Sequence, residues 1–270
     1  MSSPITADWQ YRISERDFLI GNGTDYDILL NPGPAGTVGG PPVNTVRLAR
    51  QVADGDILGR SVRGSRQITI PVQVLDERDP AGVRDLARDL VTGWRVERTG
   101  ELTLEAREPG TPETLMYYPG KPGAVDIDTR AWLFGLLTGT LEWDCSDAYG
   151  YGTTNTLDDQ SGTFTVSAGD MGDAEADTRR ATLTIHGNGG TPALVSTTDD
   201  GHDITFIDAL AGGESYVIDL YAQTVTSGGS NANASVSASS SWFVLRGGVT
   251  NSLTLTGAAT VDLAWRPAYH

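Results

Sequence analysis

Hydrophobic and polar residues alternate along much of the chain, which is the period-2 pattern of half-buried β-strands. The clearest example is RQITIPVQVLD (66–76), in which Ile68, Ile70, Val72 and Val74 fall on one face. The same pattern predicts further strands before residue 150 at 101–108, 114–120 and 133–147. The first half of the chain is therefore expected to be mainly β.

One segment in this half has a different period. In DERDPAGVRDLARDLVTGW (76–94), apolar residues recur every three to four positions, as in an amphipathic helix. Asp79 can cap the helix N-terminus, Pro80 suits the first helical position, and Gly93 can end the helix. The predicted apolar stripe comprises Val83, Leu86, Ala87, Leu90, Val91 and Trp94. We therefore predict one helix near 80–93 that lies on a sheet.

The second half is rich in Ser, Thr, Gly and Asn and shows short alternating segments without a helical period. The predicted strands are 162–168, 180–187, 193–198, 203–208, 215–225, 241–247, 252–257 and 260–267. Eight short strands separated by turns indicate a β-sandwich of jelly-roll type. The apolar pattern is lost near 150–160, so the predicted domains are 1–152, a β-sandwich with one helix, and 153–270, the jelly-roll sandwich.

Between the early strands, NPGPAGTVGGPP (31–42) is composed mostly of glycine and proline and predicts a long exposed loop. This loop is a candidate for contacts with a neighbouring subunit.

Charge narrows the classes of partner. The chain has 35 acidic and 19 basic residues, a formal net charge of −16, and Lys121 is its only lysine. Nucleic acids and anionic membranes both need cationic neutralisation, so neither is expected as a stable partner. No segment approaches the ~20 apolar residues of a membrane span, and MSSPITADWQYR at the N-terminus does not have the pattern of a secretory signal.

Catalytic chemistry is not supported by any motif. Cys145, the only cysteine, lies in GTLEWDCSDAYGYG (139–152), where Asp144 and Asp147 would oppose thiolate formation. Burial as a small apolar residue is the favoured interpretation. No G-x-S-x-G, HExxH, Walker or complete dinucleotide motif is present. The prediction is no enzyme, no catalytic residue and no cofactor.

Two acidic turns were considered as calcium sites, because oxygen ligands suffice for that ion. They are GDMGDAEAD (169–177) and TTDDGHD (197–203). Neither has the spacing of an EF-hand, so solvated turns are favoured and no metal site is predicted. Trp242, Phe243 and Trp265 could stack on sugars, but their alternating segments favour core packing.

Four stretches together resemble a known family. They are 41–74, with a proline-led strand, an Asp-Gly turn and an arginine-led strand; the closing strand 139–151; 179–206; and the segments ESYVIDLYAQTV, SWFVLRGGVTNSLTLTG and VDLAWRPAY. The chain is similar in these stretches to the distal tail protein of long-tailed bacteriophages with non-contractile tails. Ala148, where proline is common in the family, and the longer loop 246–251 depart from its pattern.

The resemblance implies a structural protein of the virion tail tip, made in the cytoplasm of the host bacterium. It implies an N-terminal domain that forms a homohexameric ring and a galectin-like C-terminal domain. The implied partners are further copies of the chain, the tail tube protein and the tip hub or tail-associated protein, with a receptor-binding protein or a host glycan as further candidates. The alternative function is a carbohydrate-binding tail protein that recognises host-surface glycans through the C-terminal jelly roll.

Cationic residues concentrate in one part of this acidic chain: Arg47, Arg50, Arg60, Arg63 and Arg66. Because the guanidinium fork suits carboxylates, we predict that some of them pair with acidic residues of a neighbouring subunit. The alternative is pairing within the chain on a solvated sheet.

Overall fold

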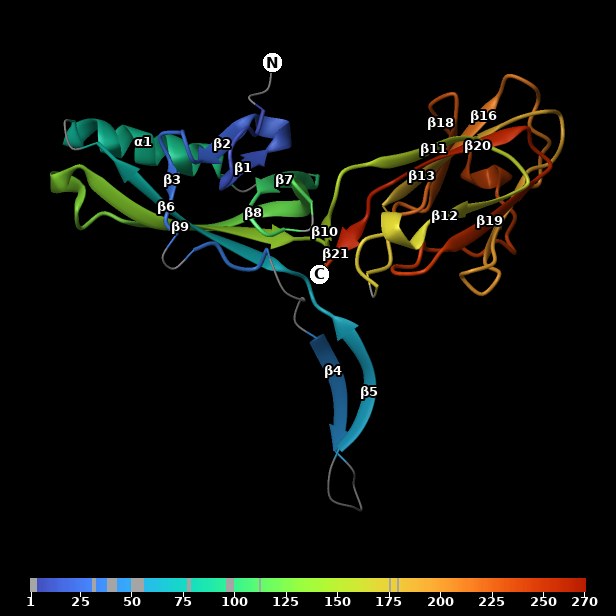
Figure 1. Ribbon diagram of the computed structural model, residues 1–270, viewed down its shortest axis with the longest axis horizontal. Coiled ribbons are helices and arrows are strands. Elements are labelled where there is room, and N and C mark those ends of the chain that lie inside the picture. The colour runs from blue at the N-terminus through green and yellow to red at the C-terminus, as the bar shows by residue number, and fades with distance from the viewer. Residues whose placement is uncertain are drawn as a thin grey trace. The chain divides into compact units, whose positions relative to one another are not determined.

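The computed structural model describes residues 4–30, 33–37, 43–49, 56–76, 79–95, 100–111, 113–174, 176–178 and 180–270. For 43–49, 56–63 and 80 the description concerns the backbone. The chain divides into two compact units, Met1–Gly150 with His270, and Tyr151–Tyr269 (Figure 1). The domain limits predicted from the sequence, 1–152 and 153–270, stay a prediction.

The first unit is built on an antiparallel sheet with the strand order β2-β1-β7-β8-β9-β6-β3. Its strands are β1 (Gln10–Ile13), β2 (Phe18–Gly21), β3 (Asp27–Ile28), β6 (Gln67–Leu75), β7 (Leu102–Arg107), β8 (Met116–Asp128) and β9 (Leu136–Cys145). Two short 3₁₀ turns are η1 (Ser14–Arg16) and η2 (Trp132–Phe134). The predicted alternation in 66–76 is confirmed, because Ile68, Ile70, Val72 and Val74 are all buried.

Helix α1 (Pro80–Gly93) covers this core, and its local signals work as predicted. The Asp79 side chain accepts the Gly82 N–H at 3.0 Å, and Pro80 occupies the first turn. Val83, Leu90 and Trp94 are buried, but Val91 is 44% exposed, so the predicted stripe is too wide. Trp94 packs edge-on against Trp143 of β9, with ring centroids 5.8 Å apart.

Two strands of the first unit form a separate antiparallel pair, β4 (Val43–Ala49) with β5 (Asp56–Arg63). The register shifts between Thr45 and Arg47, where β5 carries one extra residue as a bulge. Within the described part of the chain, the sheet assignments pair β4 and β5 only with each other. We call this pair the hairpin arm.

The second unit is a β-sandwich of two antiparallel sheets. One has the order β11-β20-β13-β16-β17-β18 and the other β12-β19-β14-β15. The strands of the first sheet are β11 (Asn155–Gln160), β13 (Ala181–His186), β16 (Ser215–Asp219), β17 (Thr224–Ser227), β18 (Ser230–Asn231) and β20 (Thr260–Trp265). Those of the second are β12 (Thr163–Val166), β14 (Ala193–Ser196), β15 (Asp203–Thr205) and β19 (Asn251–Thr256).

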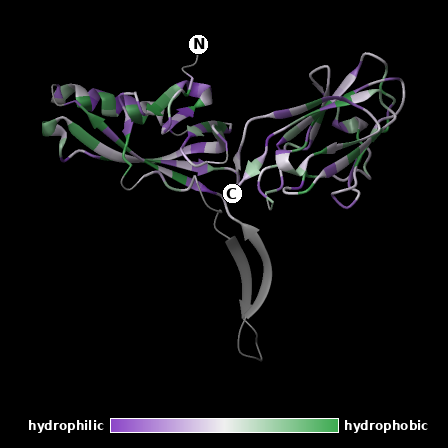
Figure 2. Cartoon of the chain, viewed as in Figure 1, coloured by the Kyte–Doolittle hydropathy of each residue, from purple (hydrophilic) through white to green (hydrophobic). Residues whose placement is uncertain are grey.

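Apolar side chains from both sheets meet in one core, which includes Leu183, Ile218, Leu194 and Leu253. Figure 2 shows hydrophobic and hydrophilic residues alternating along the strands. The remaining short elements are β10 (Gly150–Tyr151), η3 (Ala168–Asp170), η4 (Asn233–Ser235) and β21 (Ala268–Tyr269). The mainly β fold predicted from the sequence is confirmed, whereas the galectin-like topology stays a prediction.

Two predicted strands of this unit are wrong. The segment 215–225 is broken by a turn between β16 and β17, with Gln223 in the left-handed region at φ 54°. The segment 241–247 forms only an isolated bridge between Leu245 and Thr178. Side chains of Asp199, Asn251 and Asp177 bind the N–H groups of this segment, which are therefore unavailable to a sheet.

Candidate functional site

The predicted interface arginines lie mainly in the hairpin arm. Arg47 is in β4 opposite Leu58, and Arg63 ends β5 opposite Val43, with Arg60 also in β5. Arg50 lies outside the described residues. The structure gives the backbone of this arm, so pairing with a neighbouring subunit stays a prediction.

Arg66 differs from the other arginines because it is buried, with 3% of its surface exposed. Its Nη1 donates to the Thr37 carbonyl at 2.9 Å, and its guanidinium lies 5.8 Å from the centre of the Tyr118 ring. These contacts are within the first unit. Arg66 therefore fits the alternative prediction, pairing within the chain. We leave Arg66 out of the proposed interface.

Arg66 belongs to a buried polar network that the sequence analysis did not find. The Thr37 carbonyl also accepts the Tyr118 hydroxyl at 3.1 Å. The Thr37 hydroxyl donates to Glu108 Oε2 at 2.7 Å, and the Tyr11 hydroxyl donates to the other Glu108 oxygen. Thr37, Arg66 and Glu108 are each less than one-tenth exposed. We call these five residues the arm-root network.

The network fixes the chain before and after the hairpin arm, at Thr37 and Arg66, to the main sheet. Thr37 precedes β4, and Arg66 follows β5 by three residues. Beside them, Ala35 and Thr69 exchange two backbone hydrogen bonds of 2.9 Å. The Arg66 carbonyl accepts the Cys145 N–H at 2.9 Å. Residues 33–37 differ from the exposed loop predicted for 31–42, because Ala35 forms an isolated bridge with Thr69 and Thr37 is buried. Residues 31, 32 and 38–42 of the predicted loop lie outside the described residues.

Burial controls the charges of this network. Desolvation raises the pKa of Glu108, and the hydrogen bonds from Tyr11 and Thr37 offset only part of that effect. Desolvation and the nearby Glu108 carboxyl raise the pKa of Tyr11, and burial likewise raises that of Tyr118. Both phenols therefore stay protonated and act as hydrogen-bond donors.

Cys145 lies next to this network and has no reactive character. It is 3% exposed, and burial raises its pKa to about 12, although Arg66 acts in the opposite direction. A thiolate nucleophile needs a lowered pKa. The prediction that Cys145 is a buried residue of this strand, β9, is confirmed.

The second unit contains the acidic turn 197–203, whose carboxylates were considered as calcium ligands. It connects β14 to β15, and Asp199 in this turn is 4% exposed. The prediction of a solvated turn is therefore wrong for Asp199, although the side chain of Asp200 is 83% exposed.

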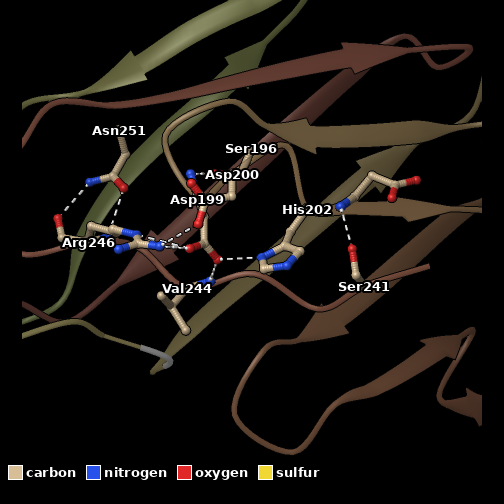
Figure 3. A network of polar contacts seen from close by, with 9 residues as sticks. Ser196, Asp199, Asp200, His202, Ser241, Val244, Arg246 and Asn251 are labelled. Atoms are coloured by element: carbon tan, nitrogen blue, oxygen red, sulfur yellow. Dashed lines mark hydrogen bonds and ion pairs between the residues drawn. The ribbon is translucent and has the colours of Figure 1, made fainter.

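Asp199 joins this turn to the segment before β19 (Figure 3). Arg246 donates from Nε and Nη2 to Asp199 Oδ1, at 2.9 and 2.6 Å. The other oxygen, Oδ2, accepts the Val244 N–H at 3.0 Å and lies 3.1 Å from His202 Nδ1. We call Asp199, His202, Val244 and Arg246 the Asp199 clasp.

A second side chain completes the bend that presents Arg246. Asn251 is fully buried, and its Oδ1 accepts the Arg246 N–H at 2.8 Å. Its Nδ2 donates to the carbonyls of Arg246 and Val249, at 2.9 and 3.1 Å. Asn251 thereby closes the loop 246–251, the loop whose length departs from the family pattern.

The partners of Asp199 lower its pKa. Desolvation acts to raise the pKa, but the Val244 N–H, His202 and Arg246 outweigh it.

In the other acidic turn, 169–177, Asp177 Oδ1 accepts the Gly247 N–H at 3.0 Å. Among the residues that the structure describes, no group of three or more His, Cys, Asp or Glu side chains is arranged to hold a metal ion.

The described helices include none that is long and apolar enough to cross a membrane.

The sequence of much of the second unit matches a protein-family model. Residues 172–269 match the model of the siphovirus-type tail component, C-terminal domain. The resemblance to siphovirus tail components is confirmed. No curated protein sequence matches the chain.

Solved structures extend the likeness to nearly the whole chain. The Dit (gp 19.1) protein of SPP1, described as a paradigm of the hub adsorption apparatus in phages that infect Gram-positive bacteria, is 12% identical with a TM-score of 0.71. The match covers 91% of this chain and 94% of that one. The phage P2 baseplate in its activated conformation with Ca gives 11% identity, a TM-score of 0.56, and coverage of 96% and 97%. Because only 11–12% of the residues are identical, these matches show a similar fold.

Proposed function

We propose that this protein is a structural component of a phage tail tip, in which copies of the chain form a ring that joins the tail tube to the hub of the baseplate. The observation that carries the proposal is the tail-component match over 172–269, together with a fold like that of SPP1 Dit along 91% of the chain. The protein acts in the virion by assembly and catalyses no reaction.

The hairpin arm is the part of the first unit best suited to contact a neighbour. Its strands pair with each other and, in the described chain, with no further strand, while the arm-root network holds the chain before and after it, at Thr37 and Arg66. Three of the predicted interface arginines lie in β4 and β5. A closed ring needs two different surfaces that meet head to tail, and an arm that reaches a neighbour supplies one of them.

The first test is the molar mass of the purified chain by light scattering over a wide concentration range. A hexamer of the 28.6 kDa chain has a mass of about 172 kDa. A ring seen by negative-stain microscopy at that mass would support the proposal. A chain that stays monomeric even when mixed with the tube protein of the same phage would contradict it.

A shortened variant tests the role of the arm. Replacing residues 43–63 by a Gly-Ser linker should abolish the ring while the main sheet still folds. Replacing Arg47, Arg50, Arg60 and Arg63 by Gln should weaken the ring by charge alone. A control is Arg88→Gln with Arg130→Gln, because both arginines are exposed in the first unit and pair with Asp85 and Asp128 of the same chain.

Glycan recognition by the second unit is the alternative function predicted from the sequence. The aromatic residues considered as sugar platforms do not support it, because Phe243 and Trp265 are buried in the core and Trp242 packs against that core. Glycan recognition therefore stays a prediction.

A further inference from the structure

The backbone ladder is interrupted where the hairpin arm joins the main sheet. On the side of the main sheet, Ala35 and Thr69 form an antiparallel bridge. On the side of the arm, Val43 pairs with Arg63. The two pairs are not in one register, because the stretches of chain that connect them differ in length. Residues 64–66 accordingly belong to neither β5 nor β6.

A side chain connects the two flanks of the arm at this interruption. Arg66, after the arm, donates from Nη1 to the carbonyl of Thr37, before the arm, at 2.9 Å. Gly64 and Ser65 alone separate Arg66 from the end of β5, so the arm follows closely on this contact. We call Thr37 and Arg66 the elbow.

The main sheet holds the elbow through Thr37. Its carbonyl accepts a second hydrogen bond, from the Tyr118 hydroxyl of β8 at 3.1 Å. Its hydroxyl donates to Glu108 Oε2, directly after β7, at 2.7 Å. Because Thr37 is buried, any rotation of this segment would break these bonds and leave polar groups unpaired.

Stability alone does not call for an arginine at the elbow. Arg66 is buried, and taking a guanidinium out of water is costly. An apolar side chain of similar size often gives equal or greater stability at such a position. An apolar side chain does not, however, supply a directional hydrogen bond across the interruption. A two-stranded pair is only marginally stable by itself, so its direction depends on how its root is held.

We propose that Thr37 and Arg66 are positioning residues for ring assembly, because the elbow sets the direction in which the hairpin arm leaves the main sheet. The arm then meets a second copy of the chain. In a closed ring the same rotation relates every copy to the next, so arms that point in variable directions do not close a ring. This inference rests on the proposed function, the formation of a ring.

The first measurement follows the direction of the arm in the full-length chain, diluted until it is monomeric. Nitroxide labels are attached at Thr45→Cys in β4 and Arg88→Cys in α1, in a Cys145→Ala background. Pulsed electron spin resonance then gives the distribution of distances between the arm and the helix. We expect a narrow distribution in the parent chain, because the elbow holds the arm in one direction.

Two arginine variants are compared in this labelled chain. The distribution should become roughly twofold broader in Arg66→Met, because the network that makes the root rigid is broken. Arg12→Met is the control, because Arg12 is a largely buried arginine of the same unit that binds Glu105, in β7, and takes no part in the elbow. It should leave the width unchanged.

Ring assembly and stability are measured separately in the unlabelled chain. Arg66→Met should raise the dissociation constant of the ring about tenfold, as expected for the loss of one hydrogen bond to a charged group. Hydrogen exchange in β6 and β9 should stay as in the parent chain. Thr37→Ser keeps the hydroxyl and should assemble like the parent, whereas Thr37→Val keeps the shape and should weaken the ring. If Thr37 only filled space, the order of these two variants would be reversed.

Two results would overturn the proposal. A narrow distribution in Arg66→Met would show that the arm keeps its direction without the elbow. Equal broadening in Arg12→Met would show that the arm responds to a general loosening of the first unit. A parent chain that forms no ring, alone or with the tube protein, would contradict the proposed function instead. The label distances would in that case still decide whether the elbow sets the direction of the arm.

Discussion

Glu108 in the first unit and Asp199 in the second are buried carboxylates that tie together segments distant in the sequence, and they differ in the charge of their partners. Glu108 accepts hydrogen bonds from the neutral hydroxyls of Tyr11 and Thr37. Asp199 accepts them from a guanidinium and a backbone N–H, and it also contacts His202. Burial alone raises the pKa of Glu108, whereas the partners of Asp199 reverse the effect of burial and lower its pKa.

The contributions of these two carboxylates to stability should therefore depend on pH in opposite directions. The folded pKa of Glu108 lies above its ordinary value, so its contribution to stability is complete in acid and is lost as the pH rises through the folded pKa. The folded pKa of Asp199 lies below its ordinary value, so its contribution is present above that value and is lost as the pH falls through the folded pKa. Partner charge, more than burial, sets the sign of each response.

The largest expected effect comes from breaking the Asp199 clasp. Asp199→Ala leaves Arg246 and the Val244 N–H without their shared acceptor and should destabilise the second unit by about 3 kcal/mol. Hydrogen exchange measured by mass spectrometry should show faster exchange in peptides from 181–265. Labelling of Cys145, which reports unfolding of the first unit alone, should stay unchanged; faster labelling would show that the clasp stabilises both units.

A slightly smaller effect is expected at the root of the arm. Gly36 has φ +90°, and a Cβ placed there would lie 2.0 Å from the Gln67 carbonyl oxygen. Gly36→Ala should therefore destabilise the first unit by about 2 kcal/mol, measured as a lower urea midpoint for Cys145 labelling. Gly110→Ala is the matched control, because Gly110 has φ +85° and nothing within 4 Å of its Cβ position. Equal effects would contradict the role of the close backbone contact.

Glu108→Gln removes the ionisable group of the arm-root network while keeping its shape. We expect a change of about 1 kcal/mol at neutral pH and a weaker dependence of the first unit's stability on pH. Cys145 labelling in urea, with a disulfide reagent that reacts in acid as well as at neutral pH, measures this dependence. Glu214→Gln, an exposed site in the second unit, is the control, and an unchanged pH profile in Glu108→Gln would refute the assignment.

The smallest effect is expected at Asp128. The Arg130 guanidinium and backbone N–H beside it lower its pKa to about 2, but both groups are on the surface. Because solvent screens such pairs, Asp128→Asn should leave the urea midpoint unchanged. An NMR titration of the Asp128 carboxyl in the parent chain should still show the lowered pKa. A lower urea midpoint would show that exposed pairs also stabilise this unit.

Local signals explain what could be predicted from the sequence. The limits of α1 follow from Asp79, Pro80 and Gly93, and the core face of β6 follows from simple alternation. The arm-root network could not be predicted, because Thr37 and Glu108 are 71 residues apart and meet only through the sheet.

The same reason accounts for the error at 241–247. That segment has the composition of a strand, but Asp199, 45 residues earlier, binds the Val244 N–H. Nothing within the segment indicates this competitor. The hydrogen bond from the Arg266 N–H to the Arg180 carbonyl likewise depends on a strand register that joins residues 86 positions apart, which alternation alone does not specify.

The first and last long strands of the second unit, β11 and β20, are partners in one sheet, and the Gly152 N–H donates to the Pro267 carbonyl at 2.9 Å. Its entry and exit points are therefore close together. A module with adjacent ends can be inserted into another chain without a change in the span that this other chain must bridge.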